Sequence, residues 1–315
     1  MSQAQTALMD AQATAAALPY GALAKAIENL LLDPSVVVPA RMVLPVGQGN
    51  TLFVMPAHDA RLAITKIITV LPDNRSRGLP SVQGDILVFD IQTGRRMAVL
   101  DGPTVTARRT AAVSLLAAQR LAPSLRGPML IVGAGEQGRA HLEAFHTGLG
   151  VQEVFVHSRS AASAAALVQH AQSMGMAAQA VHDPNQALAQ CQWVMSTTPA
   201  MEVVMTATPR QGAFVSAVGA FTPSMAEWSA QVCQELARSA TLVVDTRDAD
   251  HEAGDLLQAG VDVPSLPTLG NVVCNPLNGA LPLGHVTGKT VFFKNCGWAG
   301  WDLAAARCAA AAQRT

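Results

Sequence analysis

The sequence contains few cysteines, few charged residues and few aromatic residues. Its 315 residues include five cysteines, 14% Asp, Glu, Lys and Arg, and 4% Phe, Trp and Tyr. The cysteines are odd in number and form no C-x-x-C pair, which argues against a disulfide framework or a zinc site and favours reduced thiols in a cytoplasm. A formal net charge of −1 indicates neither nucleic acid nor an anionic membrane as a partner.

Longer sequence features are missing as well. No run of 18 apolar residues occurs, so we expect no membrane span. The first basic residue is Lys25 and Asp10 interrupts the alanine-rich start, so no signal peptide is predicted. The eight histidines show no H-E-x-x-H pattern and no G-x-S-x-G is present, so we expect neither a metal site nor a serine hydrolase. Half of the residues are hydrophobic, which is enough for a large core, and the length favours two domains.

The most specific motif lies in residues 129–138. Four apolar residues, 129–132, predict a buried strand, and residues 139–147 predict a helix. Between them, three glycines have G-x-G-x-x-G spacing, which suits a tight turn, close approach of a pyrophosphate and close helix packing. This context favours a dinucleotide site over a structural glycine turn. The residues expected to contact the cofactor here are Gly133, Ala134, Gly135, Glu136, Gln137 and Gly138.

The region after a linker at residues 123–128 alternates between strand and helix patterns, which predicts a parallel sheet. The expected strands are residues 129–133, 153–157, 177–181, 193–197, 213–218 and 241–245. The expected helices are residues 136–147, 160–174, 184–190, 224–238 and 247–259. Residues 261–288 are expected to be loop.

The end of the second of these strands indicates which dinucleotide binds. An NAD-preferring site usually has Asp or Glu about twenty residues after the glycines, to hold the ribose 2′-hydroxyl. No acid is present here, where the residues are Ser158, Arg159 and Ser160. An arginine with two hydroxyls suits a 2′-phosphate, so the pattern favours NADP(H), with NAD(H) as the alternative.

Two loops follow the fourth and fifth strands of this region. In an open α/β sheet the ligand lies at the carboxyl ends of the strands, so both loops are expected to face the nicotinamide half; the alternative is ordinary turn chemistry. Their residues are Thr197, Thr198, Pro199, Val218 and Gly219. Asp245 and residues 252–255 are expected to be structural caps or surface charges.

The first hundred residues have a different pattern, in which apolar residues alternate with a period of two. The short turns between them predict an antiparallel or mixed sheet rather than βαβ units. The expected strands are residues 41–46, 51–55, 61–70, 85–90 and 97–100, with hairpin turns at 48–50 and 92–94. Helices are expected at residues 20–32, 103–121 and 298–313, and a last strand at residues 290–294.

Three basic residues in this part are candidates for binding an anion. Lys66 lies in a strongly apolar strand, where a lysine costs desolvation unless it meets an anion; the alternative is an edge lysine that reaches solvent. Arg41 opens another strand. On the helix 103–121, either Arg108 or Arg109 could point inward, and periodicity does not decide between them. An inward guanidinium would suit a carboxylate.

Together these stretches resemble the ornithine cyclodeaminase/mu-crystallin family over residues 38–308. No single fragment is decisive, but their order and spacing are specific. In chain order they are residues 38–41, 55–56, 65–66, 79–83, 101–102, 106–112, 132–138, 218–220 and 293–297.

The resemblance implies an α/β fold in which a Rossmann domain, residues 123–290, interrupts an α+β domain for substrate binding and dimerisation, residues 1–122 and 291–315. It also implies a homodimer built through the N-terminal sheet. By position, Arg41, Lys66 and Arg109 match residues that hold the substrate carboxylate and face the nicotinamide, with Lys66 as the catalytic group. Further residues implied to lie near the cofactor are Thr110, Asn295 and Gly297.

The sequence departs from the family pattern at three positions. Cyclodeaminases have an aspartate that acts on the substrate amine, whereas Phe221 stands there and cannot do acid–base chemistry. Ser224 replaces a frequent Asp, and Val82 replaces a frequent His. These departures argue against ornithine cyclisation and indicate a more apolar pocket.

The favoured function is therefore an NAD(P)H-dependent reductase of cyclic imino acids such as pyrroline-2-carboxylate or piperideine-2-carboxylate. Arg41 and Arg109 would hold the carboxylate, and Lys66 would supply positive charge or a proton near the nitrogen. The alternatives are an ornithine cyclodeaminase, an alanine-type amino acid dehydrogenase and a non-catalytic, NADP-binding crystallin-like protein. The expected partners are NADP(H) or NAD(H), a small amino or imino acid, and a second copy of the chain.

Overall fold

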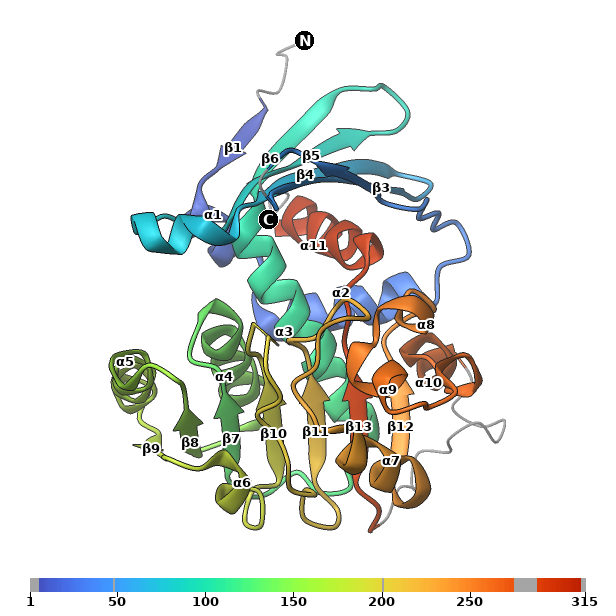
Figure 1. The fold of residues 1–315 in the computed structure, drawn as a ribbon. Coiled ribbons are helices and arrows are strands. Elements are labelled where there is room, and N and C mark those ends of the chain that lie inside the picture. The colour runs from blue at the N-terminus through green and yellow to red at the C-terminus, as the bar shows by residue number, and fades with distance from the viewer. Residues whose placement is uncertain (1–5, 48, 200, 275–287, 313–315) are drawn as a thin grey trace. The chain divides into compact units, whose positions relative to one another are not determined.

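The chain divides into two compact units (Figure 1). The computed structural model describes residues 6–47, 49–199, 201–274 and 288–312. The terminal unit consists of Met1–Arg109 and Trp298–Thr315, and the central unit consists of Thr110–Gly297. The domain boundaries expected from the sequence lay at residues 122 and 290, whereas the two units divide at residues 109 and 297.

The central unit contains a parallel sheet with the strand order β12-β13-β11-β10-β7-β8-β9. Its strands are β7 (Met129–Val132), β8 (Glu153–His157), β9 (Ala177–Ala180), β10 (Trp193–Ser196), β11 (Phe214–Ala217), β12 (Thr241–Val244) and β13 (Val291–Lys294). The strand order reverses between β7 and β10, the point where ligands bind in open α/β sheets. The predicted α/β class with a Rossmann-like sheet is confirmed.

One strand lies where the predicted domain division did not place it. β13 was expected in the substrate domain, but it pairs with β11 and β12 in the central sheet. All four of its residues are buried, as in β7, β10 and β11. The three apolar residues Val291, Phe292 and Phe293 are typical of a strand that is covered on both faces, which favours a parallel sheet, although the strand ends on Lys294.

The helices of the central unit match the prediction early in the chain and differ later. α4 and α5 agree with it, whereas the helix expected at 184–190 covers only four residues. The expected loop 261–288 contains η2 and α10, while residues 275–287 lie outside the described part. The helices are α4 (Glu136–Leu149), α5 (Ala161–Ser173), α6 (Pro184–Ala187), α7 (Ala230–Ser239), α8 (Ala249–Glu252), α9 (Gly254–Gln258), η2 (Val263–Ser265) and α10 (Leu269–Cys274).

Buried hydrogen bonds explain why the two last predicted helices are shorter than expected. α7 begins only after Ser229, whose hydroxyl accepts the N–H of Val232. The residues before it form a loop because the carboxylate of Asp255 accepts the backbone N–H groups of Glu227 and Trp228. The helix predicted at 247–259 is divided into α8 and α9.

The terminal unit contains a six-stranded sheet with the order β1-β6-β5-β4-β3-β2. The strands are β1 (Ala7–Met9), β2 (Met42–Pro45), β3 (Thr51–His58), β4 (Leu62–Val70), β5 (Val82–Asp90) and β6 (Arg96–Asp101). Neighbours from β2 to β6 are antiparallel, as the short turns predict, and β1 adds a parallel edge strand. Residue 48 of the first predicted turn lies outside the described residues.

The helices of the terminal unit cover one face of this sheet. α11 contacts β3, β4 and α2, and lies beneath the sheet in Figure 1. The remaining elements are α1 (Ala11–Ala17), α2 (Tyr20–Leu31), α3 (Gly102–Leu121), which continues into the central unit, α11 (Ala299–Ala312) and the short η1 (Pro72–Arg77). The alternating burial of β4 places Ile64, Lys66 and Ile68 on the covered face and Ile67 on the other.

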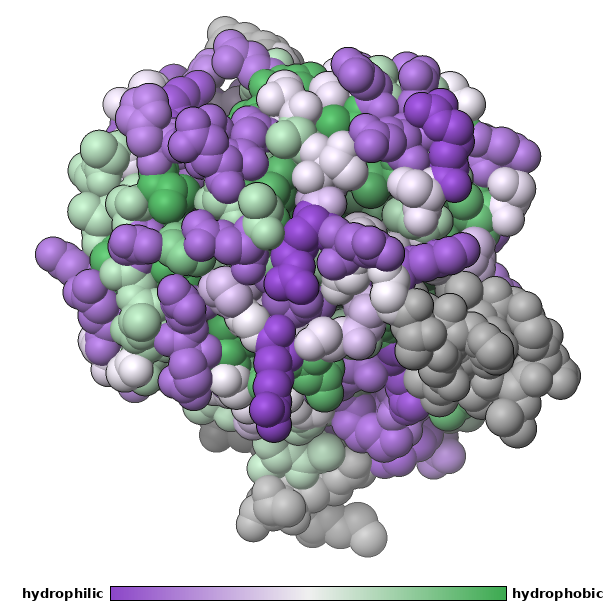
Figure 2. Space-filling model, turned by 90° about the horizontal axis from the view of Figure 1, so that it is seen from below, coloured by the Kyte–Doolittle hydropathy of each residue, from purple (hydrophilic) through white to green (hydrophobic). Residues whose placement is uncertain are grey.

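The distribution of hydrophilic side chains on the surface agrees with a hydrophobic core inside each unit. Seen from below Figure 1, the described residues show hydrophilic side chains interspersed with smaller hydrophobic areas (Figure 2). Within the part that the structure describes, no helix has the length and apolar character needed to cross a membrane. None of the five cysteines, all of which lie in the described part of the chain, forms a disulfide.

Candidate functional site

The glycine loop after β7 has the geometry that a dinucleotide pyrophosphate needs. Gly133 has φ +108°, and a Cβ there would lie 2.7 Å from the carbonyl oxygen of Thr197. A Cβ on Gly138 would lie 2.0 Å from the oxygen of Gly133, so only glycine lets α4 pack this closely. Gly135 is the N-cap of α4, has no side-chain cap and faces open space. The loop therefore fits an anionic group on the N–H groups that begin α4.

The residues that flank this loop are more exposed. Ala134 and Gln137 are half-buried, and Glu136 is exposed in the first turn of α4. After β8, Ser158 is half-buried, whereas Arg159 and Ser160 are exposed. The Ser160 hydroxyl accepts the N–H of Ser163 as the cap of α5, and Ser158 accepts the N–H of Ser160. Arg159 is thus the charged side chain at this turn.

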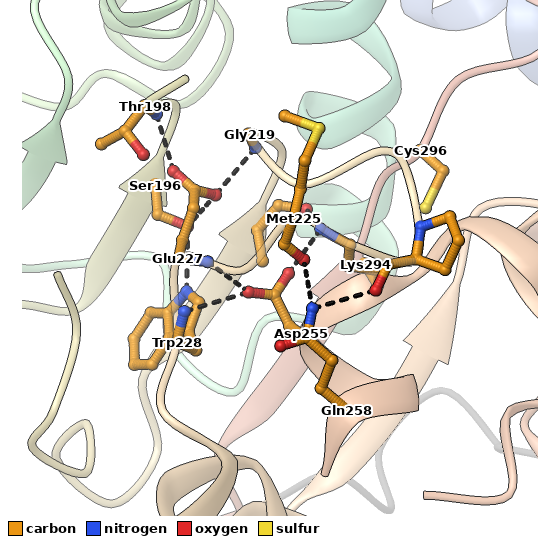
Figure 3. Close-up of polar contacts among 12 residues, drawn as sticks. Ser196, Thr198, Gly219, Met225, Glu227, Trp228, Asp255, Gln258, Lys294 and Cys296 are labelled. Carbon is orange, nitrogen blue, oxygen red and sulfur yellow. Dashed lines mark hydrogen bonds and ion pairs between the residues drawn. The ribbon is translucent and has the colours of Figure 1, made fainter. Parts of the chain in front are cut away.

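A buried carboxylate joins the two loops that follow β10 and β11 (Figure 3). Glu227 accepts the backbone N–H of Thr198 at 2.6 Å and the N–H of Gly219 at 2.7 Å. It also accepts the hydroxyl of Ser196 at 2.9 Å. Burial raises the pKa of Glu227 above its usual value. The predicted residues Thr197 and Thr198 are half-buried, Pro199 is exposed, and Val218 and Gly219 are buried.

A second carboxylate fixes the backbone of Glu227. Asp255 accepts the N–H groups of Glu227 at 2.6 Å and Trp228 at 3.0 Å, and its other oxygen lies 2.8 Å from Lys294 Nζ. The side chains of Asp255 and Lys294 are fully buried. Burial disfavours the charge of this lysine, yet Asp255 and Glu227 hold the pKa of Lys294 above its usual value.

The turn after β13 is also held by a buried acid. Asp245 accepts the backbone N–H of Cys296 at 3.1 Å and that of Gly297 at 2.7 Å. Asn295 donates to the carbonyl of Thr110 and to the hydroxyl of Ser114, each at 3.2 Å. The structure thus brings Thr110 and Asn295 together.

A separate cluster of charges lies in the terminal unit. Lys66 on β4 is 1% exposed, Arg109 on α3 is 7% exposed, and Asp302 on α11 is completely buried. Lys66 Nζ lies 3.3 and 3.5 Å from the two oxygens of Asp302, and Arg109 Nε lies 3.4 Å from one of them. Lys66 thus points inward and meets a carboxylate, and it is not an edge lysine that reaches solvent.

The neighbouring arginines also have distinct positions. Arg108 donates to the carbonyl of Leu18 and stacks on Tyr20, 3.9 Å from its centroid, so Arg109 is the one that faces the cluster. Arg41 is half-buried with its guanidinium 5.8 Å from the ring centroid of Phe53. Its charge lowers the pKa of Lys66 slightly, which places it within electrostatic range.

The Lys66–Arg109–Asp302 cluster carries one more positive than negative charge. Burial between Met55 and Ile86, its partners on the adjacent strands, lowers the pKa of Lys66 to about 8, although Asp302 acts in the opposite direction. A buried cation without a matching anion is costly. The cluster can therefore bind an anionic group and hold or release a proton near neutral pH.

Sequence reasoning missed four acidic residues. Asp302 is the one acid in a largely apolar helix, which was a usable signal. Glu227 had no comparable signal, and Asp245 and Asp255 were expected to be caps or surface charges, whereas both are buried. Phe221, at the position of the cyclodeaminase aspartate, is 43% exposed. Among the described residues no group of three or more His, Cys, Asp or Glu is placed to hold a metal.

Comparisons with known proteins agree with this geometry. The model of the ornithine cyclodeaminase/mu-crystallin family matches residues 6–312. Delta(1)-pyrroline-2-carboxylate reductase 1 of Burkholderia multivorans is 37% identical over 313 residues, which cover 97% of this chain and 95% of that protein. The ketimine reductase mu-crystallin of Mus musculus is 34% identical over 280 residues, covering 87% and 85% of the two chains.

A solved structure shows the same fold. The Delta(1)-pyrroline-2-carboxylate reductase of Thermococcus litoralis, determined with NADH and L-proline, superposes with a TM-score of 0.85 at 23% identity and covers 97% of this chain and 96% of its own. The family match spans nearly all of the described residues and includes both the glycine loop and the buried cluster. The chain belongs to the ornithine cyclodeaminase/mu-crystallin family.

Proposed function

We propose that this protein is an NAD(P)H-dependent reductase of cyclic imino acids. The observation that carries the proposal is the buried Lys66–Arg109–Asp302 cluster, whose surplus positive charge suits a substrate carboxylate. The glycine loop supplies a site for the dinucleotide. Relatives that are 37% and 36% identical over nearly the whole chain are named pyrroline-2-carboxylate reductases, the second also a piperideine-2-carboxylate reductase.

The residues have distinct roles in this reaction. Arg109 and Arg41 hold the carboxylate, because a guanidinium can bind it bidentately and so orient the C=N carbon. Asp302 holds Lys66 and Arg109 in place through its two oxygens. Reduction adds a hydride to the imine carbon and a proton to the nitrogen; Lys66 holds that proton at Nζ and donates it to the nitrogen.

The cofactor loops complete the proposal. The dinucleotide, when bound, supplies the hydride. Its pyrophosphate would lie on the N–H groups of residues 135–138, and Arg159 would hold a 2′-phosphate, which favours NADP(H) over NAD(H). Phe221 cannot act on a substrate amine, so the site supports imine reduction better than cyclodeamination.

We also propose that the protein is a homodimer. Large apolar side chains are exposed on the uncovered face of the sheet: Met42 and Leu44 on β2 and Ile67 on β4. Ile67 is 39% exposed and is paired with Val54 on the neighbouring strand β3. An apolar sheet face of this kind is typical of a protein–protein interface.

The proposed function is tested by following NADPH oxidation with pyrroline-2-carboxylate and piperideine-2-carboxylate. The parallel assay supplies ornithine with NAD⁺ and detects ammonia. Imine-dependent loss of NADPH is expected without ammonia release. Ammonia from ornithine, or no NADPH oxidation with either imine, would contradict the proposal.

The pH dependence should identify Lys66. Its lowered pKa means that it is protonated below about pH 8 and neutral above, so imine reduction should fall as pH rises through about 8. Lys66→Met should lower kcat/KM by about 10²- to 10⁴-fold, the usual contribution of a positioned acid. Lys66→Arg should still bind the substrate, but its activity should no longer fall as the pH rises through about 8. The control is Lys25→Met at an exposed lysine. The same fall of activity in Lys66→Arg as in the wild type would refute the role of Lys66.

Cofactor preference should depend on Arg159. Arg159→Ala should raise the KM for NADPH by about 10- to 100-fold, because one charge-assisted contact to phosphate is lost. The KM for NADH should stay within about twofold for the same reason. Arg238→Ala, at another exposed arginine, serves as the control. Equal effects on both cofactors would remove Arg159 from the 2′-phosphate site.

The dimer is tested by light scattering on a sizing column. The protein should elute with twice the chain mass, and Ile67→Glu should shift it to the monomer because the charge would be buried at the interface. Ile91→Glu is a matched control, since Ile91 is 42% exposed and lies outside this face, in the turn after β5. A monomeric wild type, or a dimer that tolerates Ile67→Glu, would reject this interface.

A further inference from the structure

We propose that Glu227 is a positioning residue for hydride transfer, which fixes the spacing of the loops that hold the nicotinamide half of the cofactor. The inference rests on the proposed function and assigns a role to a group that touches neither cofactor nor substrate. Its basis is the continuous set of contacts that crosses the carboxyl edge of the central sheet (Figure 3).

Three successive loops at this edge are connected. The Thr197 hydroxyl donates to the carbonyl of Gly133 at 2.9 Å, which connects the loop after β10 to the pyrophosphate loop. Glu227 then connects Thr198 to Gly219 through their backbone N–H groups. Backbone pairing joins the strands up to Val218, and beyond it the Glu227 carboxylate connects the loop after β11 to the loop after β10.

The packing leaves no room for another arrangement. A Cβ on Gly219 would lie 2.2 Å from the oxygen of Thr198 and 2.5 Å from Cδ of Glu227. The two loops and the carboxylate are therefore in direct contact, and glycine is required for that contact. A shorter acid could not reach both N–H groups from the same backbone position.

The backbone of Glu227 is itself immobilised from behind. Asp255 holds the N–H groups of Glu227 and Trp228, and its ion pair with Lys294 connects this loop to β13. Lys294 also donates to the carbonyl of Ala217 at the end of β11. Trp228 donates from Nε1 to Ser196, which in turn donates to Glu227. Because its backbone and its carboxylate are both held by hydrogen bonds, Glu227 sets the distance between the two loops.

Losing the Glu227 contacts is expected to affect the alignment of the reacting atoms more than the affinity for NADPH. Hydride transfer needs the reacting atoms in near-attack geometry, and a misplacement of about 1 Å can cost about 10²-fold in rate. The Glu227 carboxylate binds the loops after β10 and β11, whereas the proposed phosphate contacts are backbone N–H groups at the start of α4. Loss of the Glu227 contacts should therefore slow the chemical step and leave NADPH affinity nearly unchanged.

The test compares Glu227→Gln, Glu227→Asp and the control Glu235→Gln, which changes an exposed acid on α7. Glutamine places an NH₂ group against one of the two backbone N–H donors, whereas aspartate keeps the charge but is too short to accept from both of them. Both Glu227 variants should lower kcat by about 10- to 100-fold, as expected for a misplaced reacting atom. They should also raise the primary isotope effect with 4-deuterated NADPH and keep its Kd within about threefold, because the phosphate contacts remain.

A purely structural role predicts a different result. It would lower Tm and the fraction of active protein, while kcat per bound NADPH and the isotope effect would stay at the wild-type values, and this outcome would overturn the proposal. Aspartate is included because it keeps the buried charge if the glutamine variant does not fold.

A second readout does not depend on catalysis. Amide hydrogen exchange of residues 197–198 and 219–221, measured with NADPH bound, should be faster in both Glu227 variants than in Glu235→Gln. If the wild type reduces no cyclic imine, the proposed function fails while this exchange still tests the positioning role. Unchanged exchange at both loops would refute that role.

Discussion

Asp302 is shared by two buried cations, Lys66 and Arg109, and the proposed chemistry depends on this arrangement. A single carboxylate cannot neutralise both charges, so the cluster is incomplete until an anion arrives. Burial keeps the lysine pKa near 8, where the group can exchange a proton. The same carboxylate contacts both the lysine and the arginine and leaves one positive charge, which we propose is matched by the substrate carboxylate.

The central unit uses buried carboxylates for a related purpose. Glu227 and Asp245 accept backbone N–H groups from loops at the carboxyl ends of β10, β11 and β13. Loops normally have freedom to move, and a ligand then has to bear the cost of ordering them. Because charged acceptors make strong hydrogen bonds in a buried site, these loops are ordered before the cofactor binds. Preorganisation of this kind raises the rate of a step that depends on alignment.

The sequence predicted the features that depend on local pattern. The glycine spacing located the tight turn between β7 and α4, and the change from period two to strand–helix alternation separated the two kinds of sheet. The acids Asp302 and Glu227 were missed because their roles depend on residues 236 and 29 positions away, respectively. β13 was assigned to the wrong region because its three apolar residues, 291–293, are a short signal and its pairing with β11 joins segments far apart in the chain.

The central claim is that the Lys66–Arg109–Asp302 cluster binds a substrate carboxylate. The most direct test is calorimetric binding of pyrrole-2-carboxylate and of its uncharged carboxamide, which share shape and differ in charge. The account predicts that the carboxylate binds about 100-fold more tightly, from charge-assisted hydrogen bonds to arginine and lysine. It also predicts that Arg109→Met removes this difference. Equal affinity of the two compounds for the wild type would contradict the account.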